Sequence, residues 1–118
     1  MRFMSLVRSA EDQGPPPMAL MEAIGKGSQE QAKKGVLVDT GGLAPSAMST
    51  RVRVTGGKVV VTDGPFSEAK EIIGGYAVLE TSSKEQAIEA ARWLMQLHVE
   101  HWPGWEGEVE VRQIFGGP

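Results

Sequence analysis

The sequence predicts an α+β sandwich, in which an antiparallel sheet carries two helices on one face. Three observations predict it: strands of alternating apolar residues, two segments with helical apolar spacing, and the order of these elements. The order is strand, helix, strand, hairpin, strand, helix, strand, which matches a ferredoxin-like βαββ(β)αβ sandwich. The 118 residues are expected to form a single domain, 1–118.

The first part of the chain is expected to supply a strand, a helix and a second strand. Residues 3–7 are apolar enough for a short buried strand at the start of the chain. Apolar residues then recur at helical spacing, so a helix is expected at residues 18–34, either broken near Gly25 or continuing to its end. An apolar run at residues 36–38 follows, and Gly41-Gly42 is expected to end it.

The middle of the chain predicts a hairpin and a further strand. Residues 50–55 alternate cleanly, which favours a half-buried strand with its arginines pointing outward or into a cleft. Gly56-Gly57 suits a turn of the primed type, and residues 58–62 return as the paired strand. Residues 72–81 form another expected strand, in which Gly74-Gly75 indicates a bulge or a close backbone approach.

The last part of the chain predicts the clearest helix and a final strand. Ser82 or Ser83 can cap the helix, because a glutamate or glutamine follows three residues later. Pro103-Gly104 ends it, and residues 108–115 alternate as the last strand. One stripe of the helix is formed by Ala87, Ala91, Leu94, His98 and His101.

Composition excludes several classes of function. The net charge is -3 and the pI is near 5.4, so no basic surface is expected to bind nucleic acid directly. No segment is long and apolar enough to predict a membrane span. The absence of cysteine excludes thiol chemistry and fits a reducing cytoplasm, where we expect the protein to reside. The residues indicate no cofactor.

The segment Thr62-Asp63-Gly64-Pro65-Phe66 resembles the DGPF branch of the YCII-related proteins, and the likeness covers nearly the whole chain. The family's order is also followed by Gly35-Val36-Leu37-Val38, Gly42-Leu43-Ala44-Pro45-Ser46-Ala47, Glu68-x-Lys70-Glu71, Gly74-Gly75-Tyr76 and Val109-Glu110-Val111-Arg112. The resemblance implies a dimeric α/β barrel, in which two ferredoxin-like protomers pack sheet to sheet. Apolar residues on the open face of the predicted sheet also favour a homodimer.

The resemblance implies less about the activity of the protein than about its fold. Related branches resemble small enzymes with a His–Asp pair whose histidine lies on the first helix. Here residues 18–34 contain no histidine, and both histidines lie at the end of the second helix. The resemblance also implies a link to transcription, because genes of DGPF proteins tend to neighbour those of extracytoplasmic-function sigma factors. It therefore leaves open a protein partner in transcription.

Asp63 is the first candidate site residue. On a turn after a strand it can act as a general base or orient a substrate cation, or it can simply fix the turn. Glu68 and Lys70 are close in sequence, and a carboxyl buried beside another would have a raised pKa suited to proton transfer. Arg53, on the same strand face as Arg51, can clamp an anionic ligand, or either arginine can form an ordinary salt bridge.

His98 and Tyr76 complete the candidates. His98 can serve as the general base that the first helix lacks, and Tyr76 can offer its hydroxyl to a ligand or fill the sheet face. His98 and His101 are three residues apart and could face one metal, but a helix C-terminus also favours a cationic histidine.

The sequence therefore predicts a homodimer that binds a small anionic metabolite, with acid–base chemistry of isomerase, lyase or hydrolase type as an extension. Asp63 and His98 would be catalytic, and Arg53, Glu68, Lys70 and Tyr76 would bind the ligand. The alternative is a non-catalytic interaction or regulatory protein associated with sigma-factor-dependent transcription. A haem or metal enzyme, by analogy with other proteins of this fold, rests only on the two histidines.

Overall fold

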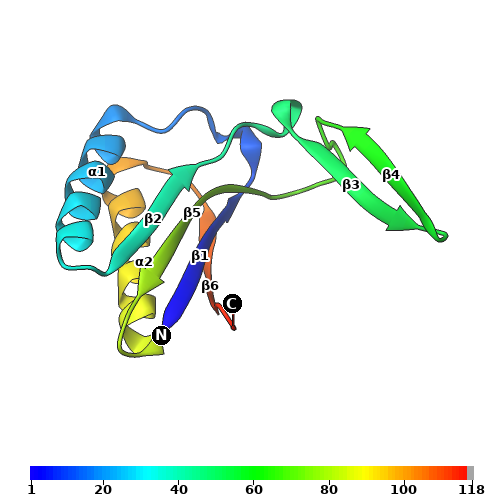
Figure 1. Cartoon of the computed structure of the whole chain (residues 1–118). Coiled ribbons are helices and arrows are strands. Elements are labelled where there is room, and N and C mark those ends of the chain that lie inside the picture. Colours follow the sequence, from blue (N-terminus) through cyan, green and yellow to red (C-terminus); the bar gives the residue numbers. More distant parts are fainter. Residues whose placement is uncertain (117–118) are drawn as a thin grey trace.

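The computed structural model describes residues 1–116 as a four-stranded sheet, two helices and a separate hairpin (Figure 1). Two short 3-10 turns, η1 and η2, lie in the connections. The elements are β1 (Arg2–Ser9), η1 (Glu11–Gln13), α1 (Met18–Lys33), β2 (Leu37–Gly42), η2 (Ser46–Met48), β3 (Thr50–Thr55), β4 (Lys58–Asp63), β5 (Ile72–Glu80), α2 (Lys84–His101) and β6 (Gly107–Gln113).

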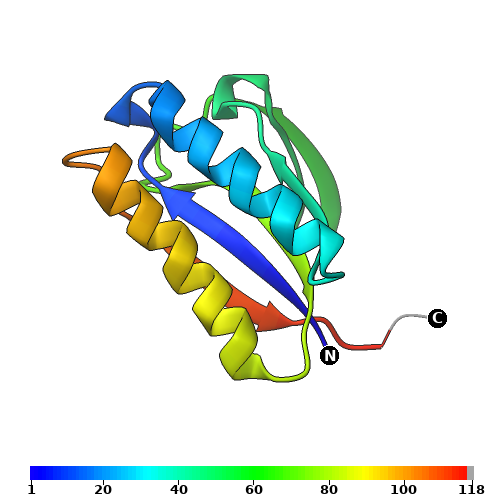
Figure 2. The ribbon, with the colours of Figure 1, turned by 90° about the vertical axis from the view of Figure 1, so that its left-hand side faces the viewer.

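The strand order in the sheet is β2-β5-β1-β6, and every neighbouring pair is antiparallel. This is the order of a ferredoxin-like sandwich, so the predicted α+β fold is confirmed. Both helices lie on one face of the sheet, side by side (Figure 2), and the other face is uncovered. We call that second surface the open face.

The core lies between the sheet and the helices. Phe3 of β1, Leu79 of β5 and Ala87 of α2 are buried together, and Leu37 and Val111 pack against them. Because side chains alternate along a strand, every second residue of β1 and β5 points at the helices. The alternate residues of the same strands therefore form the open face.

The helix predictions are largely confirmed. α1 runs without a break through Gly25 and Gly27 as far as Lys33. Gly27 is required by packing, because a Cβ there would lie 2.1 Å from Cζ2 of Trp93 on α2. At the start of α2 the Ser83 hydroxyl accepts a hydrogen bond from the Gln86 backbone N–H, as the capping pattern predicts.

The glycine pairs of the sheet behave differently from each other. The expected irregularity near Gly74 is confirmed, because Val7 pairs with Gly75 but Arg8 pairs with Ile73. The prediction that Gly41-Gly42 ends its strand is wrong, since β2 includes both residues. A Cβ at Gly41 would lie 3.0 Å from Cε1 of the Tyr76 ring, so the glycine gives that ring its place.

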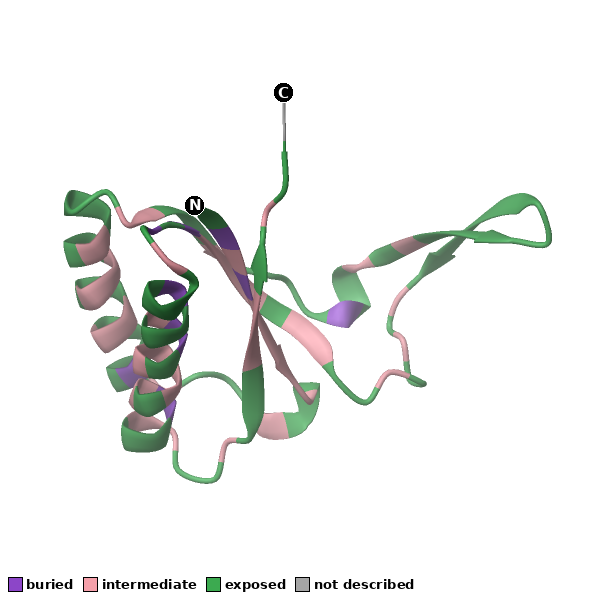
Figure 3. Cartoon of the chain, turned by 90° about the horizontal axis from the view of Figure 1, so that it is seen from below, coloured by how far each residue is buried: buried purple, intermediate pink, exposed green. Residues whose placement is uncertain are grey.

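The hairpin departs most from expectation. Its first strand and its turn lie as predicted, with Gly56 and Gly57 both at positive φ, and its second strand is one residue longer than predicted. However, β3 and β4 pair only with each other and leave the sheet, so the expected half-buried strand is wrong. We call residues 50–63 the arm. It projects away from the side of the sheet that carries the helices (Figures 1 and 3).

Within residues 1–116, neither helix is both long and apolar enough to cross a membrane.

Candidate functional site

A large cleft lies between the two helices and the sheet. It has a volume of about 590 Å³. α1 and α2 approach closely where Gly27 faces Trp93, and the sheet forms the floor. The lining is mostly apolar and includes Leu20, Ile24, Ala77, Ala91, Trp93 and Leu94. A pocket of this size and character, with a few polar groups, is typical of a site for a small ligand.

His98 is the ionisable residue that α2 contributes to the cleft. His98 is only 8% exposed, and its Nδ1 lies 2.8 Å from the Leu94 carbonyl oxygen. A carbonyl can only accept, so Nδ1 carries the proton and a neutral ring keeps Nε2 as an acceptor. No described residue hydrogen-bonds Nε2. His98 can therefore accept a proton or a hydrogen bond from a molecule in the cleft.

Two tryptophans hold the His98 ring. The ring centroid of Trp105 lies 4.3 Å away in a tilted arrangement, and that of Trp102 lies 6.2 Å away and is stacked. Both tryptophans also line the cleft. Trp105 is in turn fixed by β6, because a Cβ at Gly107 would lie 2.3 Å from its ring. The aromatic cluster thus restricts the orientation of the imidazole.

Ser5 is a functional candidate that sequence reasoning missed. It is 4% exposed, lines the cleft from β1, and its Oγ is buried without a hydrogen-bond partner among the described residues. An unpaired buried hydroxyl costs about 1–3 kcal/mol, so a ligand that pairs with it regains that energy. The available signal was a serine between Phe3 and Val7 at the inward positions of an apolar strand.

Asp63 lies outside this cleft, at the end of β4. Its Oδ1 accepts a hydrogen bond of 2.9 Å from the Thr50 hydroxyl, which ties the two strands of the arm together at their base. The side chain is exposed. Next to it, the Gly64 backbone N–H donates to the Ser49 carbonyl at 2.8 Å. In this position Asp63 braces the base of the arm.

The arginines of the arm have different surroundings. Arg51 forms an ion pair with Glu68, and its guanidinium carbon lies 3.7 Å from the Phe66 ring centroid. A backbone hydrogen bond, followed by the bond from Arg51, lowers the pKa of Glu68, and Arg53 adds a smaller effect of the same sign. Lys70 is exposed in the segment that leads back to β5. The ordinary salt bridge was the better reading of Arg51.

Tyr76 is hydrogen-bonded to a residue of the neighbouring strand β2. Its hydroxyl donates to Oδ2 of Asp39 at 3.0 Å, and that bond, together with the charge of Asp39, raises the pKa of Tyr76. Of the six predicted site residues, the cleft holds His98 and is bordered by Tyr76. The other four lie on the arm and its connection to β5. His98 lies in the helical layer and β4 beyond the opposite face, so the two predicted catalytic residues are apart (Figure 3).

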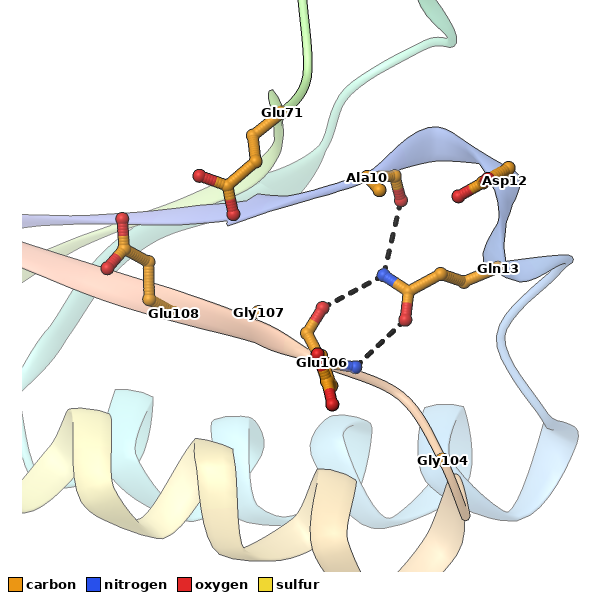
Figure 4. A pocket seen from close by; sticks show the side chains of 8 residues that line it. All are labelled: Ala10, Asp12, Gln13, Glu71, Gly104, Glu106, Gly107 and Glu108. Atoms are coloured by element: carbon orange, nitrogen blue, oxygen red, sulfur yellow. Dashed lines mark hydrogen bonds between the residues drawn. The ribbon is translucent and has the colours of Figure 1, made fainter.

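A second, acidic pocket lies at the end of the sheet from which the arm leaves. Its volume is about 510 Å³. Gln13 closes one side, because its amide donates to the Glu106 carbonyl at 2.9 Å and accepts from the Glu106 N–H at 2.8 Å (Figure 4). Within residues 1–116 no group of three or more histidines and carboxylates is arranged to hold a metal ion. The carboxylates around this pocket belong to Asp12, Glu71, Glu106 and Glu108.

Comparison with known proteins agrees with the resemblance found in the sequence. A model of the YCII-related domain matches residues 1–115. The chain is also 27% identical, over 95 residues, to an uncharacterized protein of Rhizobium meliloti (strain 1021), a match that covers 80% of this chain and 73% of that protein. Since the family model spans almost the whole chain, the protein belongs to the YCII-related family.

Proposed function

We propose that this protein binds a small ligand with an apolar body and one polar group in the cleft between the helices and the sheet. The observation that supports it is a cavity of about 590 Å³ in which His98 and an unpaired Ser5 hydroxyl are the buried polar groups. Apolar burial would supply most of the affinity, and the two polar groups would fix the orientation.

The chemistry of His98 suggests which polar group the ligand carries. With Nδ1 bound to the Leu94 carbonyl, Nε2 can accept a hydrogen bond from a hydroxyl or a weakly acidic group. A planar aromatic body would suit the neighbouring Trp105 ring. If a reaction occurs, His98 would act as the general base, which retains acid–base chemistry as the enzymatic form of this proposal.

An anionic metabolite remains the alternative ligand. Arg53 and Lys70 could attract it, but both lie on or next to the arm and not in the cleft. We also propose membership in the DGPF branch, a homodimer formed through the open face as in a dimeric α/β barrel, and a cytoplasmic location. These follow from the sequence motifs and from the uncovered sheet face.

Binding of 2-naphthol tests the proposal. All three tryptophans of the chain line the cleft, so a naphthol bound there should quench their emission by energy transfer. His98→Ala should weaken binding about fivefold, as expected for one lost hydrogen bond of about 1 kcal/mol. His101→Ala, a histidine that does not line the cleft, is the matched control and should bind normally.

Ser5→Ala provides a sharper test of the same cleft. Removal of an unpaired buried hydroxyl should stabilise the free protein by about 1 kcal/mol while it weakens 2-naphthol binding. A merely structural serine would not produce opposite changes in stability and affinity. Unquenched tryptophans, or equal affinity for 2-naphthol and 2-methylnaphthalene, would refute the proposal.

The second candidate is a non-catalytic interaction protein. The observation that favours it is the arm, whose valines are exposed although the body of the protein is folded around its own core. A sigma factor or another regulator would then be the partner. This function requires no ligand in the cleft. A substitution in the arm should therefore leave 2-naphthol binding unchanged, so the two candidate functions can be tested separately.

A further inference from the structure

Two glycines of the sheet, Gly42 of β2 and Gly75 of β5, pair with each other across the two strands. Neither has a positive φ, so the backbone conformation does not require glycine at either position. A Cβ at Gly75 would lie 3.3 Å from the Gly41 carbonyl oxygen, whereas a Cβ at Gly42 would meet no atom within 4 Å. Glycine inside a strand often marks a place where a ligand approaches the backbone closely. Packing within the chain therefore does not explain Gly42.

Both glycines lie on the face of the sheet that carries the helices. Leu79, Ala77 and Gly75 occupy every second position of β5, and Leu79 is buried in the core with α2. Gly75 pairs with Val7 on one side and with Gly42 on the other, and residues paired across strands share a face. Gly42 and Gly75 also line the cleft. A side chain added at Gly42 would therefore project into the cleft.

The neighbouring row of the sheet is also built from small side chains. Ser5 pairs with Ala77, and Ala77 pairs with Thr40. All three residues line the cleft. In these two rows β2 and β5 supply only backbone, one methyl group and one threonine to the floor of the cleft. We call Thr40, Gly42, Gly75 and Ala77 the bare floor.

Exposure along the cleft shows where its mouth lies. Met21 and Gly25 of α1 and Gly42 of β2 are exposed lining residues, whereas the lining residues of α2 are buried or half-buried. α1 lies on the β2 side of the sheet and α2 on the β6 side (Figure 2). The mouth is therefore between α1 and β2. Because the strand order is β2-β5-β1, a molecule that enters there passes over Gly42 and Gly75 before it reaches Ser5 on β1.

We propose that the bare floor selects a flat ligand, and that Gly42 and Gly75 determine this specificity. The inference rests on the proposed binding of a small ligand in the cleft and adds the shape of that ligand. A planar ring system would lie against the backbone of β2 and β5, with its hydroxyl directed inward to Ser5. A saturated ring is thicker, because it carries hydrogen atoms on both faces, so the space left by the missing side chains would not hold it as well.

Gly42→Ala tests the role of the floor in the full chain. The added methyl group should weaken 2-naphthol binding about tenfold, which is the effect of a methyl-sized change in an apolar pocket. It should not lower the urea midpoint of unfolding, because it meets no atom of the chain. Gly41→Ala is the matched control on the same strand. Its methyl group would contact the Tyr76 ring on the open face, so 2-naphthol should bind as in the wild type.

A second pair of ligands tests the shape. 5,6,7,8-Tetrahydro-2-naphthol keeps the phenol ring and its hydroxyl, and only its second ring is saturated. It should displace 2-naphthol from the wild type with an affinity that is about fivefold lower, because a thicker body overpacks the cleft. Phenol covers less of the floor, so its affinity should fall less than that of 2-naphthol in Gly42→Ala.

The results separate this inference from the proposed function. A wild type that binds 2-naphthol, together with a Gly42→Ala variant of equal affinity, would overturn the inference and leave the proposed function intact. Equal affinity for 2-naphthol and its tetrahydro analogue would do the same. An equal loss of affinity in Gly41→Ala, or a lower unfolding midpoint in Gly42→Ala, would give Gly42 a structural role instead. A wild type that does not bind 2-naphthol would refute both proposals.

Discussion

The body and the arm are built from similar apolar strands but reach stability in different ways. In the body, Phe3 and Leu79 are 1% and 2% exposed because α2 covers the sheet. In the arm, Val54 and Val59 are 79% and 69% exposed because no layer covers the hairpin. The difference shows that the body is complete as one chain, whereas the arm is fixed mainly at its base.

That base is a small polar assembly. Ser46 of η2 donates both its backbone N–H and its hydroxyl to the Glu11 carboxylate of η1. Gly64 and Ser49 close the start of the arm by a backbone hydrogen bond. The residues that position the arm are therefore distant from its exposed valines, so the base can be disturbed without a change to the core.

The largest effect is expected for Gly64→Ala. Its Cβ would lie 1.8 Å from the Ser46 carbonyl oxygen, a backbone atom that cannot move aside cheaply. We expect a local cost of about 1–3 kcal/mol, seen as amide exchange in β3 and β4 that is faster by about tenfold or more. Exchange in α2 and β5 should stay slow, which would sharpen the contrast between arm and body.

Gly74→Ala is the control for this experiment. Gly74 is exposed, and no atom lies within 4 Å of the position of its added Cβ. The arm amides of this variant should exchange at the wild-type rate. If Gly64→Ala speeds amide exchange equally in the arm and in the body, the two regions unfold together. The contrast between arm and body would then be wrong.

A pair of glycines on α1 tests the body in the same manner. Gly27→Ala would place a methyl group 2.1 Å from the Trp93 ring and should destabilise the protein by about 1–3 kcal/mol. Gly25→Ala meets no atom within 4 Å and should stabilise α1 by about 0.5–1 kcal/mol. Urea denaturation measures both, and changes of the same sign would contradict the close approach of the two helices.

Gly27→Ala also reports on the cleft. The displaced Trp93 lines the cavity, so 2-naphthol binding should weaken while the exchange of arm amides stays the same. An arm that responds to this substitution would show that body and arm are coupled.

Local signals predicted the hairpin and the helices well. Gly56-Gly57 between an alternating run and a valine-rich run predicted the hairpin turn, and the serine before α2 marked its cap. These features depend on residues within a few positions of one another. The departure of the hairpin from the sheet depends instead on what lies beside it. Alternating valines and arginines look the same in a half-buried strand and in a free arm.

The candidate site was predictable only in part for the same reason. The apolar stripe of α2 pointed to His98, which the structure buries in the cleft. Asp63 and Arg53 were grouped with it because the turn motif is conspicuous, and the chain alone does not show that this turn belongs to the arm. Ser5 escaped notice, because a serine in a strand becomes informative only when its hydroxyl is seen to lack a partner.

The smallest expected effect concerns acid and the base of the arm. The hydroxyl of Ser46, followed by its backbone N–H, lowers the pKa of Glu11 below the ordinary value of about 4.5. A lowered pKa in the folded state means that the carboxylate stabilises the base fully above the ordinary value. This contribution is lost as the pH falls through the lowered pKa.

Acidification should therefore loosen the arm before it affects the body. A carbon-detected NMR titration of Glu11 should give a midpoint below 4.5, and the Ser46 amide proton should shift with it, since that N–H lies 2.8 Å from Oε2. Ser46→Ala removes the larger cause, so the pKa of Glu11 should rise toward its ordinary value. A wild-type Glu11 that already titrates at the ordinary value would show that this anchor does not hold the arm in solution.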